Sequence, residues 1–575
     1  MKNNNEITSP NMKYITIILG YLIVFPFFGF SQSEDLKTNE EVMVIAPFNP
    51  TIRKAKRIHF LPQSDSNKAA KLEIDYITDP KIFPTNIPME DLTAAKFVED
   101  KTPNYSQNFV KLGYGLYSTP YAELFFNSKL SNESQVGVYA KYLATHGDIK
   151  EVAYSGNNNS KVKVWTKRIQ KKFTTKLNVH YQRNEMQFYG FKPEDYPADL
   201  LKDTDNFKED MKQIYNKVGV DVDLKGTYKK RYYNWDAQLN YNYYWDHFSS
   251  EEQLIDLKGY YESPVKIIKV EKQYFGANIK TQTYYTNQNF KGLFPAIDSS
   301  QGLFHGLYEF TPYYRMEHNN FKLKIAYKMQ IGADSSDAYF YSVPEIHMNV
   351  SLLDDALSIY ALLDGGLQNN SLQSLSQENP FMSPVVPIKY SKSKYRIRAG
   401  LKGHYTSSFD FNIYGEMADF ENMPLYITDT NARFDNTFKV IYDGGRRYAT
   451  AMELMYNKGD WNVNLNAQYN IYQMDTVAQA WQKPAFTSKL KISYHLLENL
   501  KLSALLIGQS KMYNYYKGEQ TVNPWFDMSF KANYHWKRTL AFYLTVSNVL
   551  SNNYEIWYGY PVQSIGIMGG VSLAL

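Results

Sequence analysis

The chain alternates apolar and polar residues in blocks along most of its length. From Trp461 to Ile471, apolar residues occupy every odd position and Asn or Gln every even position. The same period recurs from Phe321 to Ile331 and from Phe526 to Trp536. Successive side chains of a β-strand point to opposite faces of a sheet, so this period predicts strands with one apolar face and one polar face.

Two features favour strands that cross a lipid bilayer over the strands of a soluble β-sandwich. The alternating blocks are long, roughly ten residues or more, whereas strands of globular sheets are about five or six residues long. Tyr and Trp also lie near the ends of the apolar faces, where an interfacial aromatic girdle is expected. Beyond the N-terminal region, no segment approaches the roughly 18 apolar residues of a membrane-spanning helix.

The blocks and the turn residues between them predict an all-β fold: a large transmembrane antiparallel β-barrel of about 22 strands. An even strand number is typical of single-chain bacterial barrels. We place the strands near residues 106–117, 119–130, 134–146, 160–169, 173–189, 211–225, 232–247, 251–261, 272–286, 303–317, 319–331, 338–351, 354–366, 390–406, 407–421, 445–457, 460–474, 482–497, 499–511, 523–535, 539–550 and 563–575.

The predicted connections tend to alternate between short and long. Short ones include 319–320, 457–460 and 498–499, and long ones include 190–210 and 367–389. This alternation is typical of barrels with short periplasmic turns and long outer loops. The segment 434–442 has a strand-like sequence, and we assign it to an extended outer hairpin.

Composition narrows the class of protein further. The 575 residues include 51 Tyr and no Cys. Without Cys the chain cannot form a disulfide or a thiolate metal site, and it cannot be an acylated lipoprotein. A net charge of +5, from 63 basic and 58 acidic residues, gives no electrostatic basis for binding nucleic acid.

The N-terminal residues have the layout of an export signal. Lys13 precedes the apolar run 14–30, and Ser31-Gln32 follows it. We therefore predict a signal peptide over residues 1–32, and export to the outer membrane of a Gram-negative bacterium. An N-terminal membrane anchor is the alternative, because 17 apolar residues are near the lower limit for spanning a bilayer.

Both ends of the predicted barrel carry sequences with a familiar pattern. Residues 540–575 read LAFYLTVSNVLSNNYEIWYGYPVQSIGIMGGVSLAL, and residues 110–130 read VKLGYGLYSTPYAELFFNSKL. They resemble the last two strands and the first hairpin of TonB-dependent outer-membrane receptors, in the variants common in Bacteroidetes. The resemblance implies a barrel over residues 106–575. It also implies that Val571, Leu573 and Leu575 form the closing signal that the barrel-assembly machinery reads, although these receptors usually end in Phe.

The segment 33–105 departs from that family, because a full receptor carries a plug domain of well over a hundred residues. We interpret these residues as a short periplasmic or lumenal segment, a reduced plug or a linker. Within it, Glu41, Val42, Met43, Val44, Ile45 and Ala46 resemble a TonB box, the extended segment that pairs with a strand of TonB. The alternative, an ordinary short strand of the segment, is favoured slightly.

The sequence contains few candidates for catalytic or cofactor-binding motifs, and we predict neither an enzyme nor a cofactor. There is no phosphate-binding loop, nucleophile elbow or His-Glu-x-x-His motif. Several Lys residues alternate with apolar ones and should face the lumen, where they would either attract an anionic ligand or pair with lumenal acids or a plug surface. We favour pairing; these residues are Lys322, Lys324, Lys328, Lys489, Lys491 and Lys531.

The resemblance implies a transport protein that binds or imports a nutrient, with loops such as 190–210 and 367–389 capturing the ligand. Its partners would be outer-membrane lipid, the barrel-assembly machinery and, through residues 41–46, TonB. Two alternatives stay open. The barrel is a structural or assembly subunit that holds a surface lipoprotein or another partner, or it is a passive porin.

Overall fold

The computed structural model describes residues 108–129, 131, 133–146, 149–197, 211–226, 234–270, 272–289, 300–335, 337–353 and 356–575. All of the described residues belong to one compact unit. The predicted signal peptide and the segment 33–105, with Glu41 to Ala46, lie outside the described residues.

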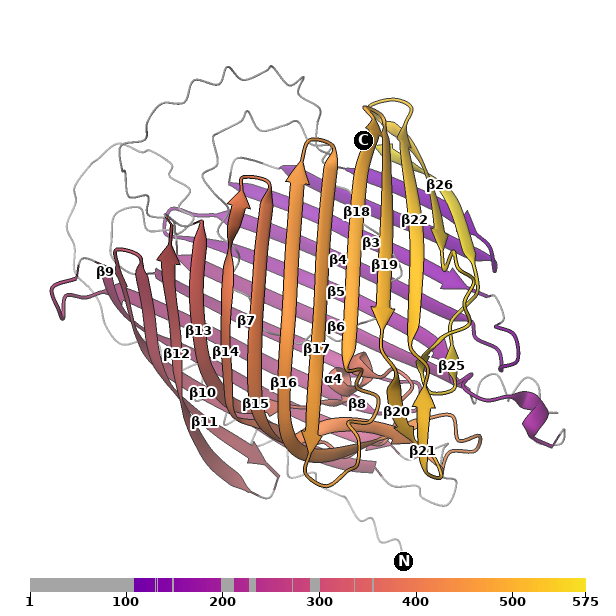
Figure 1. Cartoon of the computed structure of the whole chain (residues 1–575), viewed down its shortest axis with the longest axis horizontal. Coiled ribbons are helices and arrows are strands. Elements are labelled where there is room, and N and C mark those ends of the chain that lie inside the picture. Colours follow the sequence, from indigo (N-terminus) through magenta and orange to yellow (C-terminus); the bar gives the residue numbers. More distant parts are fainter. Residues whose placement is uncertain are drawn as a thin grey trace, which may run out of the picture. The chain divides into compact units, whose positions relative to one another are not determined.

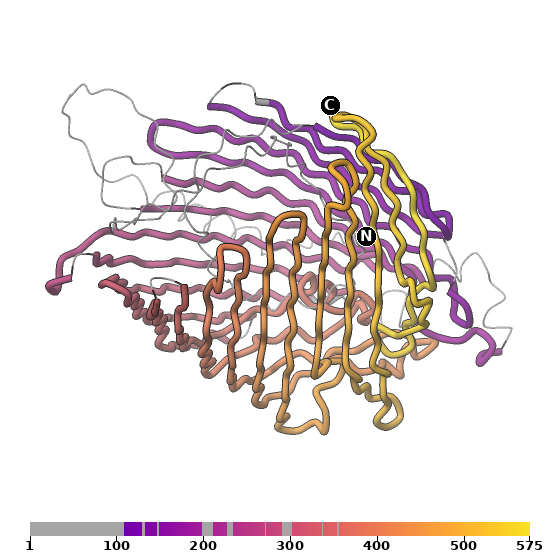
Figure 2. The backbone as a smooth tube through the Cα atoms, turned by 45° about the horizontal axis from the view of Figure 1, so that its top comes forward, coloured from indigo at the N-terminus to yellow at the C-terminus, as the bar shows by residue number. Residues whose placement is uncertain are grey.

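The described chain forms a closed barrel of 22 antiparallel strands (Figures 1 and 2). Each strand pairs with the next along the barrel, and β1 pairs with β26 to close the ring. The predicted strand number and fold class are therefore confirmed. The barrel strands are β1 (Phe109–Gly115), β2 (Thr119–Lys129), β3 (Ser134–Thr145), β4 (Asn157–Ile169), β5 (Phe173–Gln187), β6 (Lys212–Gly226), β7 (Asn234–Trp245), β8 (Glu251–Pro264), β9 (Lys272–Asn289), β10 (Ser300–His318), β11 (Phe321–Asp334), β12 (Ala338–Leu352), β13 (Leu357–Asn369), β14 (Tyr390–Thr406), β15 (Phe409–Thr428), β16 (Phe438–Lys458), β17 (Trp461–Met474), β18 (Phe486–Leu497), β19 (Leu500–Gln509), β22 (Trp525–His535), β23 (Leu540–Ser547) and β26 (Gly566–Ala574).

The two ends of the barrel differ in the length of their connections. At one end, the turn end, strands join through short segments such as 407–408 and 498–499. Gly459 adopts a φ of 56° in one of these turns, a left-handed conformation that costs glycine little. The chain enters and leaves the barrel at this end, where Phe109 lies opposite Ala574.

The other end, the loop end, carries the long connections and, among the described residues, six short elements. These are η1 (Pro193–Asp195), α4 (Leu372–Glu378) and the hairpins β20 (Met512–Tyr515) with β21 (Glu519–Val522) and β24 (Glu555–Trp557) with β25 (Tyr560–Pro561). The predicted extended hairpin around 434–442 is present: the end of β15 pairs with Phe438 to Asp443 of β16, whereas β16 pairs with β17 only from Gly445. Thr428 at the end of β15 pairs with Phe438 at the start of β16, and the turn between them is 429–437.

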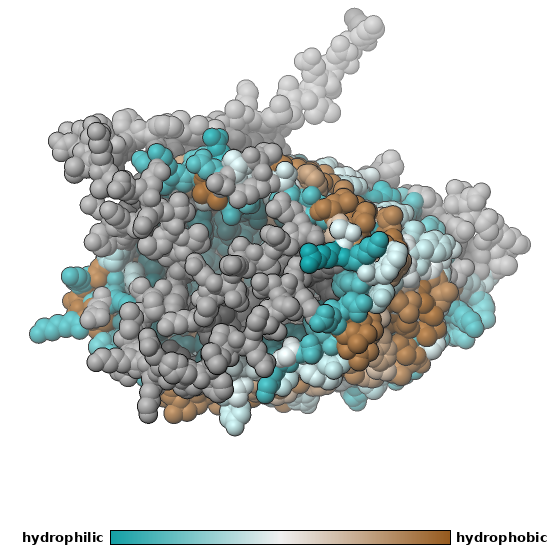
Figure 3. All heavy atoms as spheres, turned by 90° about the horizontal axis from the view of Figure 1, so that it is seen from above, coloured by the Kyte–Doolittle hydropathy of each residue, from teal (hydrophilic) through white to brown (hydrophobic). Residues whose placement is uncertain are grey.

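The outer face of the barrel is apolar, as the alternation predicts. Ile325, Tyr327 and Ile331 on β11 are each nearly half exposed. Apolar side chains gather in patches on the flank of the barrel in the view from the turn end (Figure 3). Such an apolar outer band is what a lipid bilayer requires of a transmembrane barrel. Among the described residues, no helix combines the length and apolar character needed to cross a membrane.

Glycines at the β1–β26 seam make room for an aromatic bridge. The Tyr543 hydroxyl donates to the Leu112 carbonyl oxygen at 3.2 Å, reaching across β26 from β23. A Cβ atom on Gly113 would lie 2.0 Å from that hydroxyl oxygen, and one on Gly570 would lie 2.1 Å from the Leu112 oxygen. Gly113 of the first strand and Gly570 of the closing strand therefore serve the packing of the seam.

Candidate functional site

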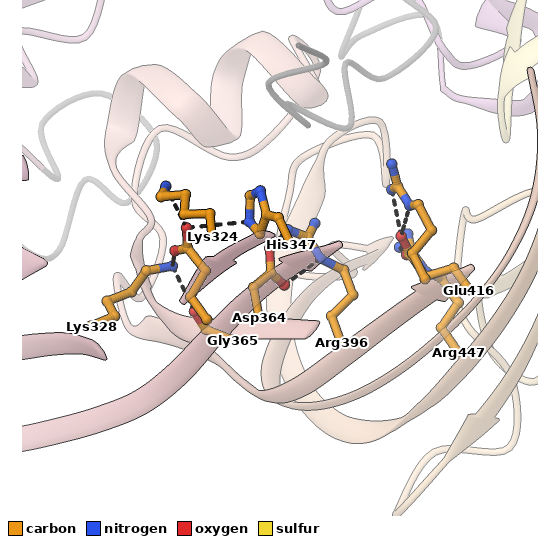
Figure 4. A network of polar contacts seen from close by, with 10 residues as sticks. Lys324, Lys328, His347, Asp364, Gly365, Arg396, Glu416 and Arg447 are labelled. Atoms are coloured by element: carbon orange, nitrogen blue, oxygen red, sulfur yellow. Dashed lines mark hydrogen bonds and ion pairs between the residues drawn. The ribbon is translucent and has the colours of Figure 1, made fainter. Parts of the chain in front are cut away.

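Charged side chains form a network across the inner face of β11 to β16 (Figure 4). Lys324 and Lys328 on β11 lie 3.0 and 3.5 Å from the Glu345 carboxylate on β12. Asp364 on β13 pairs with Arg396 on β14. Because each partner lies on a neighbouring strand, the network links the strands in addition to their backbone hydrogen bonds.

A second part of the network is more deeply buried. Glu416 on β15 accepts a hydrogen bond from Arg398 Nε at 2.9 Å and also pairs with Arg447 on β16. The Arg398 and Glu416 side chains are 7% and 1% exposed. The Arg398 guanidinium also lies over the Tyr414 ring, 4.2 Å from its centroid. This part of the wall is therefore a packed polar layer in which each guanidinium has a carboxylate partner.

The predicted lumenal lysines divide among three strands. Lys322, Lys324 and Lys328 lie on β11, Lys489 and Lys491 on β18, and Lys531 on β22. The structure brings Lys324 and Lys328 together on one carboxylate, while Lys322 lies opposite Glu317 in the ladder. Lys531 is buried, at 6% exposure. The six residues therefore do not form one basic cluster.

The predicted closing residues lie on the outer face of the last strand. Val571, Leu573 and Leu575 are 38%, 41% and 65% exposed. The Leu575 amide donates to the Asn108 carbonyl oxygen at 2.9 Å, which continues the ladder of the seam. The structure places these residues at the turn end, and their reading by the barrel-assembly machinery stays a prediction.

Near the loop end, β13 leaves the barrel wall. Its pairing with β12 runs from Leu357 only to Leu363, and Gly366 adopts a φ of 135° just beyond. The Leu367 backbone then binds the side chain of Gln330 on β11, through bonds of 2.7 and 3.2 Å. Since β12 lies between β11 and β13 in the wall, the end of β13 bends inward and crosses over β12.

The connection that follows, residues 370–389, is folded into the loop end; we call it the strap. It contains α4, which begins after Ser371 with a side-chain capping box. Glu252 on β8 accepts hydrogen bonds from the backbone amides of Leu372 and Gln373 at 2.6 and 3.2 Å. Gln288 on β9 makes two hydrogen bonds with the Val386 backbone, at 2.7 and 2.9 Å. The wall of β8 and β9 therefore holds both ends of the strap.

The middle of the strap is held by strands on either side. Tyr215 on β6 donates to the Pro380 carbonyl oxygen at 3.0 Å. Phe438 on β16 donates its amide to the Phe381 carbonyl oxygen at 3.0 Å and accepts from the Ser383 amide at 2.8 Å. The strap is thus bonded to β6, β8 and β9 and also to β16, so it crosses the loop end.

A large apolar cluster surrounds the strap and involves several other loops. Burial of apolar side chains away from water is the main favourable contribution to the stability of a fold. Its buried members are Ile149, Ala153, Phe188, Tyr189, Phe191, Met211, Tyr215, Tyr244, Leu372, Leu375, Phe381, Met382, Val386, Tyr426, Phe434, Phe438, Val440, Trp557 and Tyr560. We call this set the loop-end core. Its members come from at least five connections, one of which is the strap, and these connections pack together as one unit.

Asp246, in the turn between β7 and β8, makes the stability of this region depend on pH. Burial raises its pKa to about 7, although the Ser250 amide and the Gln213 side chain donate hydrogen bonds to the carboxylate. Because the folded pKa lies above the ordinary value of 3.8, this group's contribution to stability is complete below about pH 4 and is lost as pH rises through 7.

We therefore expect the purified barrel to unfold at a higher temperature at pH 5 than at pH 8, and Asp246→Asn to flatten that difference. The measurement is the thermal unfolding midpoint in detergent across this pH range. Asp195→Asn, in the exposed loop of η1, is the matched control and should leave the profile unchanged. An identical pH profile for wild type and Asp246→Asn would contradict the assignment.

A cavity of about 230 Å³ lies where the strap meets the wall. Its lining comes from the loop ends of β10, β11 and β12 on one side and from the strap and its flanking strands on the other. The lining residues are Leu303, His305, Asp334, Tyr339, Asn369, Asn370, Ile388, Lys389, Tyr390 and Asn422. No group of three or more metal-ligating side chains occurs among the residues that the structure describes.

The prediction that loop 367–389 captures a ligand is not tested, but the position of this loop is informative. It is packed inward and does not project from the barrel. The residues that hold it, above all Glu252 and Gln288, were not singled out from the sequence, because each occupies an ordinary polar position on an alternating strand. A polar residue buried by a distant loop leaves no local signal.

No protein-family model and no curated protein matches this sequence. Among solved structures, the pyoverdine outer-membrane receptor FpvA from Pseudomonas aeruginosa PAO1 is similar, with a TM-score of 0.62 at 12% identity over 81% of this chain and 78% of that one. The ferric-catecholate import receptor Fiu from E. coli K12 has a TM-score of 0.60 at 10% identity, over 81% of each chain. The copper transporter OprC has a TM-score of 0.59 at 10% identity, over 81% of this chain and 80% of that one.

These likenesses agree with the resemblance found at the two ends of the barrel. The similar structures are described as receptors or a transporter. With its closed ring of 22 strands and its apolar outer face, the chain has the fold of TonB-dependent outer-membrane receptors.

Proposed function

We propose that this protein is an outer-membrane receptor that binds a small ligand at its loop end and admits it to the barrel lumen. The loop end would face the cell exterior, as the long connections of outer-membrane barrels do. The observation that carries the proposal is the strap, which is folded into the loop end and is bonded to β6, β8 and β9 of the wall and to the β15–β16 hairpin. A barrel of this fold with an inward-folded loop supports a gated route more than an open pore.

Gating requires that the strap move, together with the loop-end core that packs on it, and the hydrogen bonds that tie the strap to the wall suit such a motion. Many of its wall contacts are backbone hydrogen bonds to single side chains, such as those of Glu252 and Gln288. Each bond of this kind contributes only about 0.5–1.5 kcal/mol net, more when a charged group takes part. A ligand that replaces a few of these bonds would therefore shift the strap towards an open arrangement.

Energy for uptake would come through residues 41–46, by pairing with a strand of TonB. We expect deletion of 41–46 to abolish ligand-dependent growth while the barrel remains in the outer membrane. The measurement compares growth of the wild-type, gene-deleted and 41–46-deleted strains on a panel of nutrients, with immunoblots of the outer membrane. A nutrient that the gene-deleted strain fails to use identifies the phenotype to be scored.

A deletion of equal length, residues 64–69, provides the control for shortening the segment before the barrel. It should leave growth unchanged. If the strain lacking 41–46 grows as well as wild type on the nutrient that the gene-deleted strain cannot use, TonB coupling is wrong. If no nutrient separates the gene-deleted strain from wild type, the uptake function itself is contradicted.

A further inference from the structure

The inner face of β3, β4 and β5 is basic. Val162 and Val164 on β4 are 42% and 43% exposed on the outer face, so the residues that alternate with them point into the lumen. In the register of the three strands, the inward positions include several lysines and no Asp or Glu. These lysines are Lys141, Lys161, Lys163, Lys167 and Lys176. This part of the wall therefore presents positive charge to the lumen.

Four of these lysines make neither an ion pair nor a hydrogen bond with any residue that the structure describes. They are Lys161, Lys163, Lys167 and Lys176, all of them partly exposed, and we call them the lysine patch. Lys167 and Lys176 lie directly opposite each other in the ladder, and Lys161 lies opposite Lys141. Like charges in such cross-strand positions repel each other. An anionic partner on this face would relieve that repulsion.

The neighbouring strands provide few acids for the lysine patch. On β6, Asp221 lies 3.5 Å from His180, and Asp223 lies opposite Lys176 in the ladder but forms no ion pair with it. On β2, Glu123 is buried, at 2% exposure. Between β11 and β16, by contrast, the basic groups of the charged network lie on carboxylates. The lysine patch differs from that network because the wall does not supply its counter-charge.

The chain carries a segment of opposite charge just before the barrel. Residues 73–100 contain seven acids and two lysines, a net charge of −5. The acids are Glu73, Asp75, Asp79, Glu90, Asp91, Glu99 and Asp100. Residues 53–71 contain six basic residues and one acid, a net charge of +5. Negative charge is therefore concentrated in the part of the N-terminal segment that is closest in sequence to the barrel.

The connection to β1 allows this acidic segment to reach the lysine patch. β1 begins with Phe109 at the turn end, and Lys167 and Lys176 flank the turn 170–172 at the same end. Three strand spacings, about 14 Å in all, separate β1 from β4. The chain from Asp100 to Phe109 spans up to roughly 30 Å when extended. The last acids of the segment can therefore meet the lower lysines, and the earlier ones the higher lysines.

We propose that the acidic segment 73–100 lies inside the barrel along β4 and β5, with its carboxylates paired to the lysine patch. A soluble polyanion has the same chemistry, but a tethered segment competes at an effective concentration in the millimolar range. Such pairs are partly exposed to lumenal water, so salt weakens them. The inference concerns how the chain occupies its own lumen, and it holds whether or not the barrel takes up a nutrient.

Thiol protection in the purified full chain tests this docking, because the chain contains no Cys. Gln182→Cys places a reporter opposite Lys161 without removing a lysine. We expect its reaction with a bulky maleimide in detergent to be slow at low salt. The reaction should become about tenfold faster or more when the seven acids of 73–100 are replaced by Asn or Gln, or when salt is raised to about 0.5 M.

Two controls confine the effect to this wall. Gln468→Cys occupies a matched inward position on β17, on the opposite wall (Figure 1), and its labelling should be the same with and without the acids. Replacing Lys489 and Lys491 on β18 by Gln should leave the reporter slow, whereas replacing the lysine patch by Gln should make it fast. Combining the patch and acid replacements should add nothing more, since both act through the same contacts.

Three outcomes would overturn the docking. One is equal labelling of Gln182→Cys with and without the seven acids. Another is a parallel rise at Gln468→Cys, because the barrel would then have opened as a whole. The third is a reporter that is fast in the intact chain and is slowed by added polyphosphate, since the patch would then take a soluble anion instead of the segment. None of these outcomes bears on the uptake function, which the nutrient panel tests separately.

Discussion

Replacing Glu252 by Ala is expected to release the strap and expose the loop end of the barrel. The Glu252 carboxylate accepts hydrogen bonds from Leu372, Gln373 and Thr286, and it is 1% exposed. Removing it leaves one buried and one partly buried backbone amide without an acceptor, at about 1–3 kcal/mol for the buried one and less for the other. A combined loss of that size would raise the population of the open strap by roughly 10²-fold or more, since about 1.4 kcal/mol corresponds to a factor of ten.

The absence of Cys from the chain makes this change measurable with a single introduced thiol. Ser376→Cys places the thiol on α4, at a position that is 3% exposed. Its rate of reaction with a bulky maleimide in detergent should be slow in the intact protein and rise roughly 10²-fold with Glu252→Ala. Lys517→Cys, at an exposed loop position, reports the rate of an accessible thiol.

Glu251→Ala is the matched control, because this neighbouring residue on β8 accepts only the Tyr243 hydroxyl among the hydrogen bonds described. It should leave the labelling of Ser376→Cys slow. Fast labelling of Ser376→Cys in the protein with Glu252 present would show that the strap is already open. Slow labelling with Glu252→Ala would show that the loop-end core alone holds it closed.

Replacing Glu416 by Ala is expected to produce the largest loss of barrel stability. The change removes the carboxylate that pairs with both Arg398 and Arg447 inside the wall, so that both guanidinium groups lose this counter-charge. Removing one partner from a buried ion pair costs about 3–5 kcal/mol, because the remaining charge has lost both water and its counter-charge. The measurement is the urea midpoint for unfolding the barrel from lipid vesicles.

Two further variants test the physical reason for that loss. Glu453→Ala removes another inner-face carboxylate, one that accepts a hydrogen bond from the neutral Asn412 amide at 3.1 Å, and should shift the midpoint much less. Adding Arg447→Met to Glu416→Ala should recover part of the stability, since one stranded charge is removed. A Glu416→Ala midpoint equal to that of Glu453→Ala would contradict the role of the buried charges.

The structure also shows where local pattern stops being informative. Lys324 and Lys328 were predicted to face the lumen from their alternation with apolar residues, and they lie there on β11 beside Glu345. The same pattern describes Gln330, yet its function differs, because the end of β13 crosses over it and binds its side chain. Alternation assigns a face of a strand; it contains no information about which distant segment covers that face.

The sequence by itself determined the number of strands, their order and the faces they present. Each of these properties follows from interactions between neighbours along the chain or across one hairpin, so a period of two and the turn residues suffice. The closure of the ring between the first and last strands was expected from the resemblance of residues 110–130 and 540–575 to TonB-dependent receptors.

Only the tertiary structure decided the strap, the loop-end core and the cavity beside them. Leu372, Tyr560 and Phe188 lie in different connections and meet in one apolar cluster. Glu252 becomes an anchor only because residue 372, far along the chain, is brought to it. These contacts arise from the packing of irregular segments, whose geometry no periodic pattern encodes. The sequence therefore predicts the barrel, whereas the strap that lies across its loop end is seen only in the tertiary structure.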